Sequence, residues 1–333
     1  MKLGKLKFSR DKLNICQVSL KGNIPIIVKN YQRFKYFYKN FNIFIICPKN
    51  EISFFKKKLK FDEIVVISED QIISSKKFKK IFLKLSKKYQ FKDLFEERLS
   101  WYYQQILKLS FIFYFLKRFK KKIILWDADT IITKKIKFFE GNYSVKFGTF
   151  LEFHKSYFEI NKALLRKIPK YFISSVIQFG SMTEIECKIL MNKLNLRSTK
   201  INVISNNLSI LILKKIFFIN NSYNGSLFSE YELIGNSNNL VKPGKQIMIS
   251  NLRKGLKGTL TPIQLKILNI LNFTNVTYEH TYNNSNSKGM LKRKLGWIDF
   301  VTLVLKTKIK FYYNVIKHNI FFIFNIDKIN LKD

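Results

Sequence analysis

The alternation of apolar and polar residues in the first quarter of the chain predicts strands separated by helices. Short apolar runs at 13–20, 42–48 and 62–70 are rich in Ile and Val and end in polar residues or proline, as buried strands do. The intervening segments 26–40 and 50–59 have helical spacing. This order favours right-handed crossovers and a parallel sheet, with ligands at the carboxyl ends of its strands.

A strongly helical segment follows at 96–119, "EERLSWYYQQILKLSFIFYFLKRF". Trp101, Gln105 and Lys108 are spaced to share one face of this helix, and Gln104 lies one turn from Lys108. Two interpretations remain open. The segment is either an ordinary amphipathic helix with a core tryptophan and solvated glutamines, or its polar set lines a ligand.

The next apolar run, "KIILW" (122–126), predicts a strand that ends at an Asp-x-Asp motif. In an extended chain Asp127 and Asp129 would point to the same face. Two carboxylates at a strand end suit Mg²⁺ or Mn²⁺ held together with a diphosphate. The alternative is that both aspartates cap a turn. The motif alone is weak evidence, and its position after a buried strand favours a ligand site.

The formal net charge of +39 comes mainly from lysine, since only eight of the 61 basic residues are arginine. Proteins that read base sequence usually rely on arginine forks, and their basic residues are clustered. Here lysine is spread over the whole chain, including a segment at 74–92 that we interpret as a polar link. The composition argues against nucleic acid as the main partner. A diffusely basic surface would still attract phosphorylated ligands and anionic membranes.

The sequence lacks the motifs that mark several common classes of protein and site. No G-x-G-x-x-G follows the first strand and no P-loop motif occurs, which disfavours a dehydrogenase or a P-loop NTPase. The cysteines, Cys16, Cys47 and Cys187, have no metal-type spacing and fit a reducing cytoplasm. The basic N-terminus lacks the apolar region of a signal peptide, and no run approaches 18 apolar residues. We therefore expect a cytoplasmic protein without a membrane span.

Four segments in order carry a family resemblance. "WYYQQILKL" and "IILWDADTII" are followed by "FISSVIQFGSM" (172–182), with a helix from Thr183, and by "FSEYELIGN" (228–236). Together they resemble a bacterial family of glycosyltransferase-like proteins classified as a domain of unknown function (DUF6492-like). That family is related to the nucleotide-diphospho-sugar transferases of GT-A fold. The resemblance covers roughly 13–280, and it leaves the role of Gln178 in the third segment open.

The resemblance implies an α/β, GT-A-like (Rossmann-like) fold with a mixed, mainly parallel sheet flanked by helices. It also implies a glycosyltransferase that uses Mn²⁺ or Mg²⁺, a nucleotide-sugar donor and a glycan or lipid-linked acceptor. Asp127 and Asp129 would bind the metal, as would His280, which ends an expected edge strand at 275–280. A lone histidine is, however, more often a surface residue than a ligand. The residues expected to bind the donor are Trp101, Gln104, Gln105, Lys108 and Asp127.

Glu230 and Glu232 are the candidate catalytic residues. Glu230 matches the glutamate of the family's S-E-Y-E segment and would act as the general base that deprotonates the acceptor, while Glu232 would orient the acceptor. The alternative is that acidic residues in a first helical turn only interact with the helix dipole. The base assignment requires that Ser229, and not Glu230, caps the helix.

The C-terminal part of the chain changes in composition. We expect a transferase domain at 1–282, a polar linker at 283–296 and a basic amphipathic helical extension at 297–333. The extension either packs on the core or lies on an anionic membrane, which would make the protein peripheral at the inner face of the cytoplasmic membrane. The rival to a transferase is a non-enzymatic basic protein that binds nucleic acid or an anionic membrane surface. Acidic residues gathered around Asp127 and Glu230 would favour the transferase.

Overall fold

The computed structural model describes most of the 333-residue chain. The described residues are 12–89, 98–166, 173–219, 226–242, 246–253, 256, 258–278 and 294–329, with side chains described as far as Lys317.

The first quarter of the chain forms the predicted strands and helices. They are β1 (Leu13–Val18), α1 (Ile24–Phe37), β2 (Phe41–Cys47), α2 (Ile52–Lys58) and β3 (Ile64–Ser68). Pro25 lies in the first turn of α1, where its missing N–H removes no helical hydrogen bond. Ile27, Tyr31 and Phe34 then recur at helical spacing and are buried, so α1 packs one face on the sheet.

The central sheet has the strand order β3-β2-β1-β4-β9, with β4 at Ile123–Trp126 and β9 at Phe179–Met182. The first four strands are parallel and β9 is antiparallel to β4. This confirms the predicted α/β class with a mainly parallel sheet. The predicted strand at 172–182 is shorter than expected, because only its last four residues pair with β4.

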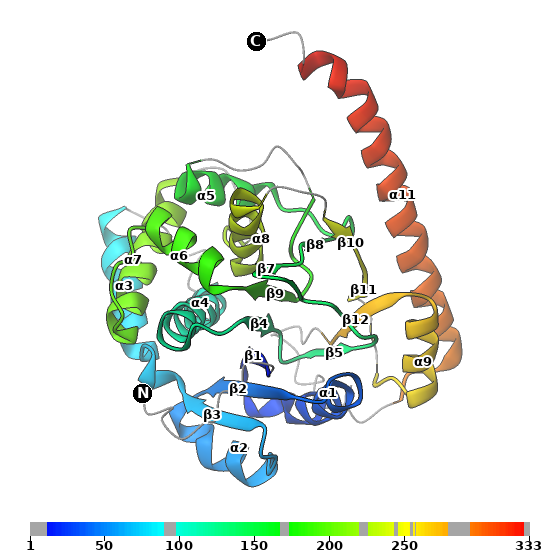
Figure 1. Ribbon diagram of the computed structural model, residues 1–333, viewed down its shortest axis with the longest axis horizontal. Coiled ribbons are helices and arrows are strands. Elements are labelled where there is room, and N and C mark those ends of the chain that lie inside the picture. The colour runs from blue at the N-terminus through cyan, green and yellow to red at the C-terminus, as the bar shows by residue number, and fades with distance from the viewer. Residues whose placement is uncertain are drawn as a thin grey trace.

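Helices cover both faces of this sheet (Figure 1). One face carries α1 and α2, whose apolar residues form one core cluster with the strands. The helices that contribute to the cluster on the other face are α3 (Ser75–Lys88), α4 (Leu99–Phe119), α5 (Lys155–Leu165), α6 (Glu184–Lys193), α7 (Ile201–Ile219) and α8 (Glu230–Val241).

The lysine-rich segment at 74–92 was wrongly predicted as a polar link, because most of it is α3. Ser74 caps this helix by accepting a hydrogen bond from the Lys77 backbone N–H. Phe78, Phe82 and Leu85 are buried at helical spacing while the lysines between them face solvent. The segment was predicted to be a link because lysine dominates its composition, and the three buried apolar residues at helical spacing were overlooked.

A smaller sheet has the order β11-β12-β5, with β11 at Ser250–Leu252, β12 at Phe273–Thr277 and β5 at Thr130–Ile132. β12 is therefore a central strand, and the prediction of an edge strand was wrong. Its neighbours are only three residues long and leave no clear pattern in the sequence. The remaining short strands are β6 (Phe139–Glu140), β7 (Tyr143–Ser144), β8 (Phe147–Gly148) and β10 (Ile247–Met248), paired as β6-β7 and β8-β10.

The C-terminal extension is the long helix α11 (Trp297–Ile329), which confirms the predicted helical extension. It runs along one side of the molecule next to α9 (Pro262–Ile270), and its last turns extend past the rest of the protein (Figure 1). Phe300 and Val304 anchor its first turns in a third apolar cluster. Of the predicted linker, 283–293 lies outside the described residues, and Leu295 is buried in the same cluster.

Among the described residues, α7 is long and apolar enough to cross a membrane by length and composition alone. The prediction concerned only uninterrupted apolar runs, and α7 contains polar residues between its apolar ones. Half of the helix is buried inside the protein, where Ile204, Leu208 and Ile212 pack in the core.

Candidate functional site

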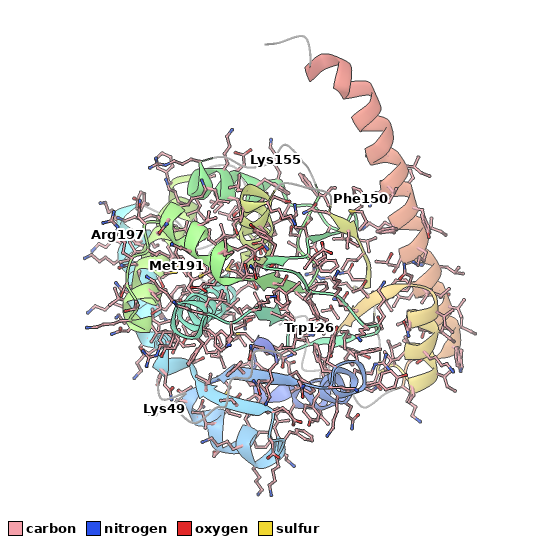
Figure 2. The ribbon with its side chains drawn as sticks, in the orientation of Figure 1. Lys49, Trp126, Phe150, Lys155, Met191 and Arg197 are labelled. Carbon is pink, nitrogen blue, oxygen red and sulfur yellow. The ribbon has the colours of Figure 1, made fainter. Side chains whose placement is uncertain are left out.

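The Asp-x-Asp motif forms a tight turn between β4 and β5. The backbone N–H of Thr130 donates to the Asp127 carbonyl (3.1 Å), and the Trp126 indole N–H donates to the Thr130 carbonyl (2.8 Å). Trp126 is fully buried at the centre of the molecule, where it stacks on Phe179 with ring centroids 5.2 Å apart (Figure 2). The expectation that Asp127 and Asp129 continue an extended strand was wrong. They sit on a turn that the buried tryptophan holds in place.

A buried ion-pair network links this turn to two helices. The Lys108 ammonium of α4 donates to Asp127 Oδ1 and to Glu230 Oε1, both at 2.6 Å. Glu230 is the first residue of α8, and its neighbour Tyr231 donates its hydroxyl hydrogen to the same Oδ1 of Asp127 (2.6 Å). Three residues predicted for the site therefore meet, and Tyr231 joins them. Tyr231 lies inside the S-E-Y-E segment, but its role was not predicted.

The pKa values of this network reflect burial and charge together. Burial would lower the pKa of Lys108, but the attraction of Asp127 and Glu230 outweighs it and raises that pKa above its ordinary value. For Glu230, burial raises the pKa and the neighbouring Lys108 opposes the rise. Burial and the charge of Asp127 raise the pKa of Tyr231 well above 10, so this phenol stays a hydrogen-bond donor.

The backbone of Gln178 also supports the turn. Its carbonyl accepts the Asp127 N–H (3.0 Å) and faces the Tyr231 hydroxyl (3.3 Å). Gln178 has φ = 62°, the left-handed region that non-glycine residues enter at a cost of roughly 1–3 kcal/mol. Its side chain contacts the Asn251 amide nitrogen (2.6 Å) and Arg253 Nη1 (3.0 Å). A strained residue that shapes the environment of Asp127 was not visible in the sequence.

The two glutamates in the first turn of α8 have different surroundings. The Ser229 hydroxyl accepts a hydrogen bond from the Glu232 N–H (3.5 Å), so the predicted cap by Ser229 is confirmed. Glu232 is buried away from Lys108 and accepts the Ser175 N–H (3.0 Å). Burial raises its pKa to about 7, despite stabilisation of the charged form by Ser174 and Ser175. The structure does not bring Glu232 into the network of Lys108 and Asp127.

The donor-binding residues predicted on α4 differ in their surroundings. Trp101 stacks on Tyr157 of α5 at a centroid distance of 6.3 Å, and Gln104 is half-buried. Gln105 is buried one turn before Lys108, and neither atom of its amide has a hydrogen-bond partner among the described residues. Orphaned buried amides are rare in folded proteins and are typical of sites that a ligand or water completes.

Gln17 has the same property and was missed by the sequence analysis. It is the second-last residue of β1, at the carboxyl end where ligands of α/β proteins bind. Its side chain is buried, and both amide atoms lack a partner within the described part of the chain. The only signal in the sequence is a polar residue inside an apolar strand.

Asp127 and Asp129 are the described carboxylates that could hold a divalent ion. Both are half-buried, and the Asp127 side chain keeps 24% of its surface exposed. No cluster of three acidic, histidine or cysteine side chains suited to a metal occurs among the described residues. Mg²⁺ commonly takes only one or two carboxylates and completes its shell with phosphate and water oxygens, so the pair fits such an ion.

The prediction for His280 lies outside the described residues. The last described residue before it, Tyr278, donates its backbone N–H to the Asp129 carbonyl (2.9 Å). The end of β12 therefore lies beside the Asp-x-Asp turn.

Comparisons with known proteins give fold-level likenesses only. No family model matches the chain, and no curated protein matches it. The resemblance to the bacterial family named above therefore stays a prediction. A solved structure of mouse xyloside xylosyltransferase 1 is similar over 83% of this chain and 98% of that one, with 9% identity and a TM-score of 0.40.

The bifunctional glycosyltransferase WbbM is also similar, over 87% of this chain but 53% of its own, with 9% identity and a TM-score of 0.34. At such values neither likeness bears on the chemistry of this site.

Proposed function

We propose that this protein is a metal-dependent glycosyltransferase that moves a sugar from a nucleotide-diphospho-sugar to a glycan or lipid-linked acceptor. The observation that carries the proposal is the buried Lys108 between Asp127 and Glu230, beside the turn that follows β4. Transfer from such a donor needs stabilisation of a diphosphate leaving group and removal of the acceptor's proton. A cation and two carboxylates at the carboxyl edge of the sheet suit both tasks.

On this proposal Asp127 and Asp129 hold Mn²⁺ or Mg²⁺, which when bound offsets the charge on the departing nucleotide diphosphate. Lys108 and Tyr231 both bind Oδ1 of Asp127 and so fix the orientation of its carboxylate. Lys108 also brings a permanent positive charge to the site, because its pKa is raised. His280, the third metal ligand that the family resemblance implies, lies outside the described residues and stays a prediction.

Glu230 is the proposed general base. Burial raises the pKa of its carboxyl group, which makes it a better proton acceptor than an exposed glutamate. The acceptor hydroxyl would give its proton to Glu230 as its oxygen bonds to the anomeric carbon and the bond from that carbon to the diphosphate breaks. This step inverts the anomeric configuration. Glu232 is proposed to orient the acceptor indirectly, because its carboxylate accepts the backbone N–H of Ser175 and so fixes the segment around Ser175.

The polar side chains without partners support a donor site on α4 and β1. The buried amides of Gln105 and Gln17 can each both donate and accept hydrogen bonds. A nucleotide sugar carries hydroxyl and base groups that would satisfy them. Trp101 and Gln104, on the same helix as Lys108, complete the proposed donor-binding set.

The distribution of acidic residues favours the transferase over a basic binding protein. Only 22 acidic residues occur in the whole sequence, yet Asp127, Asp129 and Glu230 all lie close enough to raise the pKa of Tyr231. A protein that binds nucleic acid through its lysines gains nothing from an acidic centre built around a buried lysine. Such a centre is, in contrast, what metal binding and proton transfer require.

The test is a screen of nucleotide sugars. We expect nucleotide sugars of one nucleotide class to raise the melting temperature of the protein in the presence of Mn²⁺ and not after chelation. We also expect the protein to hydrolyse these nucleotide sugars slowly to nucleoside diphosphate even without an acceptor. The Asp62→Asn variant, which changes an exposed aspartate, is the matched control for Asp129→Asn. Failure of every nucleotide to stabilise the protein, with no release of nucleoside diphosphate, would contradict the proposal.

A further inference from the structure

The helix α11 exposes apolar side chains along one line. Ile298, Leu305, Ile309 and Ile316 are 84%, 55%, 68% and 58% exposed, and their intervals of seven, four and seven residues return to one side of an α-helix. Val301, Tyr312 and Tyr313 widen this line and are about half exposed or more. We call these seven residues the outer stripe. Scattered apolar residues need no explanation, but a continuous exposed stripe indicates an interaction surface.

The outer stripe is not the side on which α11 packs on the protein. The packing side carries the buried Phe300 and Val304, then Phe311, whose ring lies 6.4 Å from that of Phe150, and Asn314, whose amide donates to the Phe150 carbonyl (2.7 Å). These residues project from the helix opposite the outer stripe. A surface helix normally has one apolar face. This helix has two, one that faces the protein and one that faces away.

Lysine residues accompany the outer stripe. Four lysines and one aspartate occur at 297–317, and Lys306, Lys310 and Lys317 form an exposed row beside the stripe. Lys306 and Lys310 also line a cavity of about 220 Å³ next to Arg253 and Glu152, so three cations face it against one carboxylate. An apolar stripe with lysines on its flank is complementary to an anionic lipid surface.

We infer that α11 binds the protein to an anionic lipid bilayer, lying in the plane of the interface. The five aliphatic residues of the outer stripe enter the acyl region, its two tyrosines lie at headgroup level, and the lysine row contacts lipid phosphates. The last turns of α11 extend past the rest of the protein (Figure 1). This inference goes beyond sugar transfer and does not depend on it.

The experiment is co-sedimentation of the full chain with vesicles. We expect binding to vesicles of phosphatidylcholine and phosphatidylglycerol in equal parts, little binding to phosphatidylcholine alone, and weaker binding at high salt. Ile309→Glu should reduce the partition coefficient at least about tenfold, because it removes an isoleucine side chain from the acyl region and places a negative charge next to anionic lipid. The side chain is exposed, so circular dichroism and melting temperature should be unchanged.

Phe218→Glu is the matched control, because Phe218 is 73% exposed on α7, at the opposite side of the molecule from α11 (Figure 1). This variant should bind vesicles like the unmodified chain. The inference is contradicted if Ile309→Glu binds anionic vesicles as tightly as Phe218→Glu, or if the unmodified chain does not bind them. It is also contradicted if sedimentation velocity shows a dimer that Ile309→Glu dissociates, since a second copy would then cover the stripe.

Discussion

Lys108 Nζ and Glu230 Oε1 are 2.6 Å apart, although the two residues are separated by 122 positions in the sequence. Both side chains are buried, with 8% and 3% of their surface exposed. The pair joins α4 to the first turn of α8, next to Asp127. A buried charge that loses its partner is costly, so this contact couples the stability of the protein to the geometry of the proposed site.

Replacement of Lys108 by methionine should therefore lower the free energy of unfolding. We expect a loss of about 3–5 kcal/mol, because Glu230 and Asp127 remain buried without their cation. Urea unfolding measures the effect. In Lys108→Met/Glu230→Gln a neutral amide replaces one of the two carboxylates, and this double variant should regain part of the loss. A single variant as stable as the unmodified protein would mean that Lys108 is not buried between the two acids.

Asp129→Asn should abolish nucleotide-diphosphate binding that depends on Mn²⁺ and leave the fold intact. The substitution removes a charged oxygen ligand at almost constant volume. Its side chain accepts a long hydrogen bond from the Thr130 hydroxyl (3.3 Å), which the amide oxygen of asparagine can also accept. Isothermal titration with and without chelator measures the binding, with Asp62→Asn as control. Equally tight binding in the Asp129 variant, insensitive to chelator, would remove Asp129 from the metal site.

Glu230→Gln separates catalysis from positioning. The amide oxygen can still accept from Lys108, so donor affinity should stay nearly unchanged. The amide cannot accept the acceptor's proton, and the transfer rate should fall by about 10² to 10⁴. Steady-state kinetics with donor and acceptor varied in turn give both values. A parallel loss of donor affinity would show that Glu230 acts by holding Lys108, and unchanged turnover would exclude it as the base.

Much of the fold could be predicted from apolar spacing. The strands β1 to β4 are short apolar runs that are mostly buried, and α1 has a helical period that its burial follows. The long apolar segment of α4 was also predictable as a helix, although it is buried on most sides. The errors have local causes. Lysine masked the stripe of α3, and the partners of β12 are too short to carry a pattern.

The site was predictable only in part. The Asp-x-Asp motif and Lys108 stand out because acidic residues are rare and Lys108 shares a helix face with other polar residues. The roles of Tyr231 and Gln178 depend on contacts over 104 and 51 positions, which no local pattern encodes. The left-handed conformation of Gln178 is also imposed by tertiary structure, since nothing in its own residue type favours it.

The buried carboxyl group of Glu232 should make stability depend on pH near neutrality. The folded protein keeps the Glu232 proton up to about pH 7, whereas an unfolded chain releases it near the ordinary value of 4.5. The folded state therefore binds more protons in this interval, and its stability falls as the pH rises through it. A shift of this size corresponds to about 3 kcal/mol.

Glu232→Gln cannot ionise and keeps an oxygen that can accept the Ser175 N–H. Its free energy of unfolding, compared with that of the unmodified protein, should rise between about pH 5 and pH 8 by most of that amount. Urea unfolding across this range measures the difference. Glu184→Gln, which alters an exposed acid in α6, is the control for the substitution itself. If the free energy of unfolding of Glu232→Gln instead falls relative to that of the unmodified protein as the pH rises, the Glu232 carboxylate is ionised in the folded protein and held by Ser175.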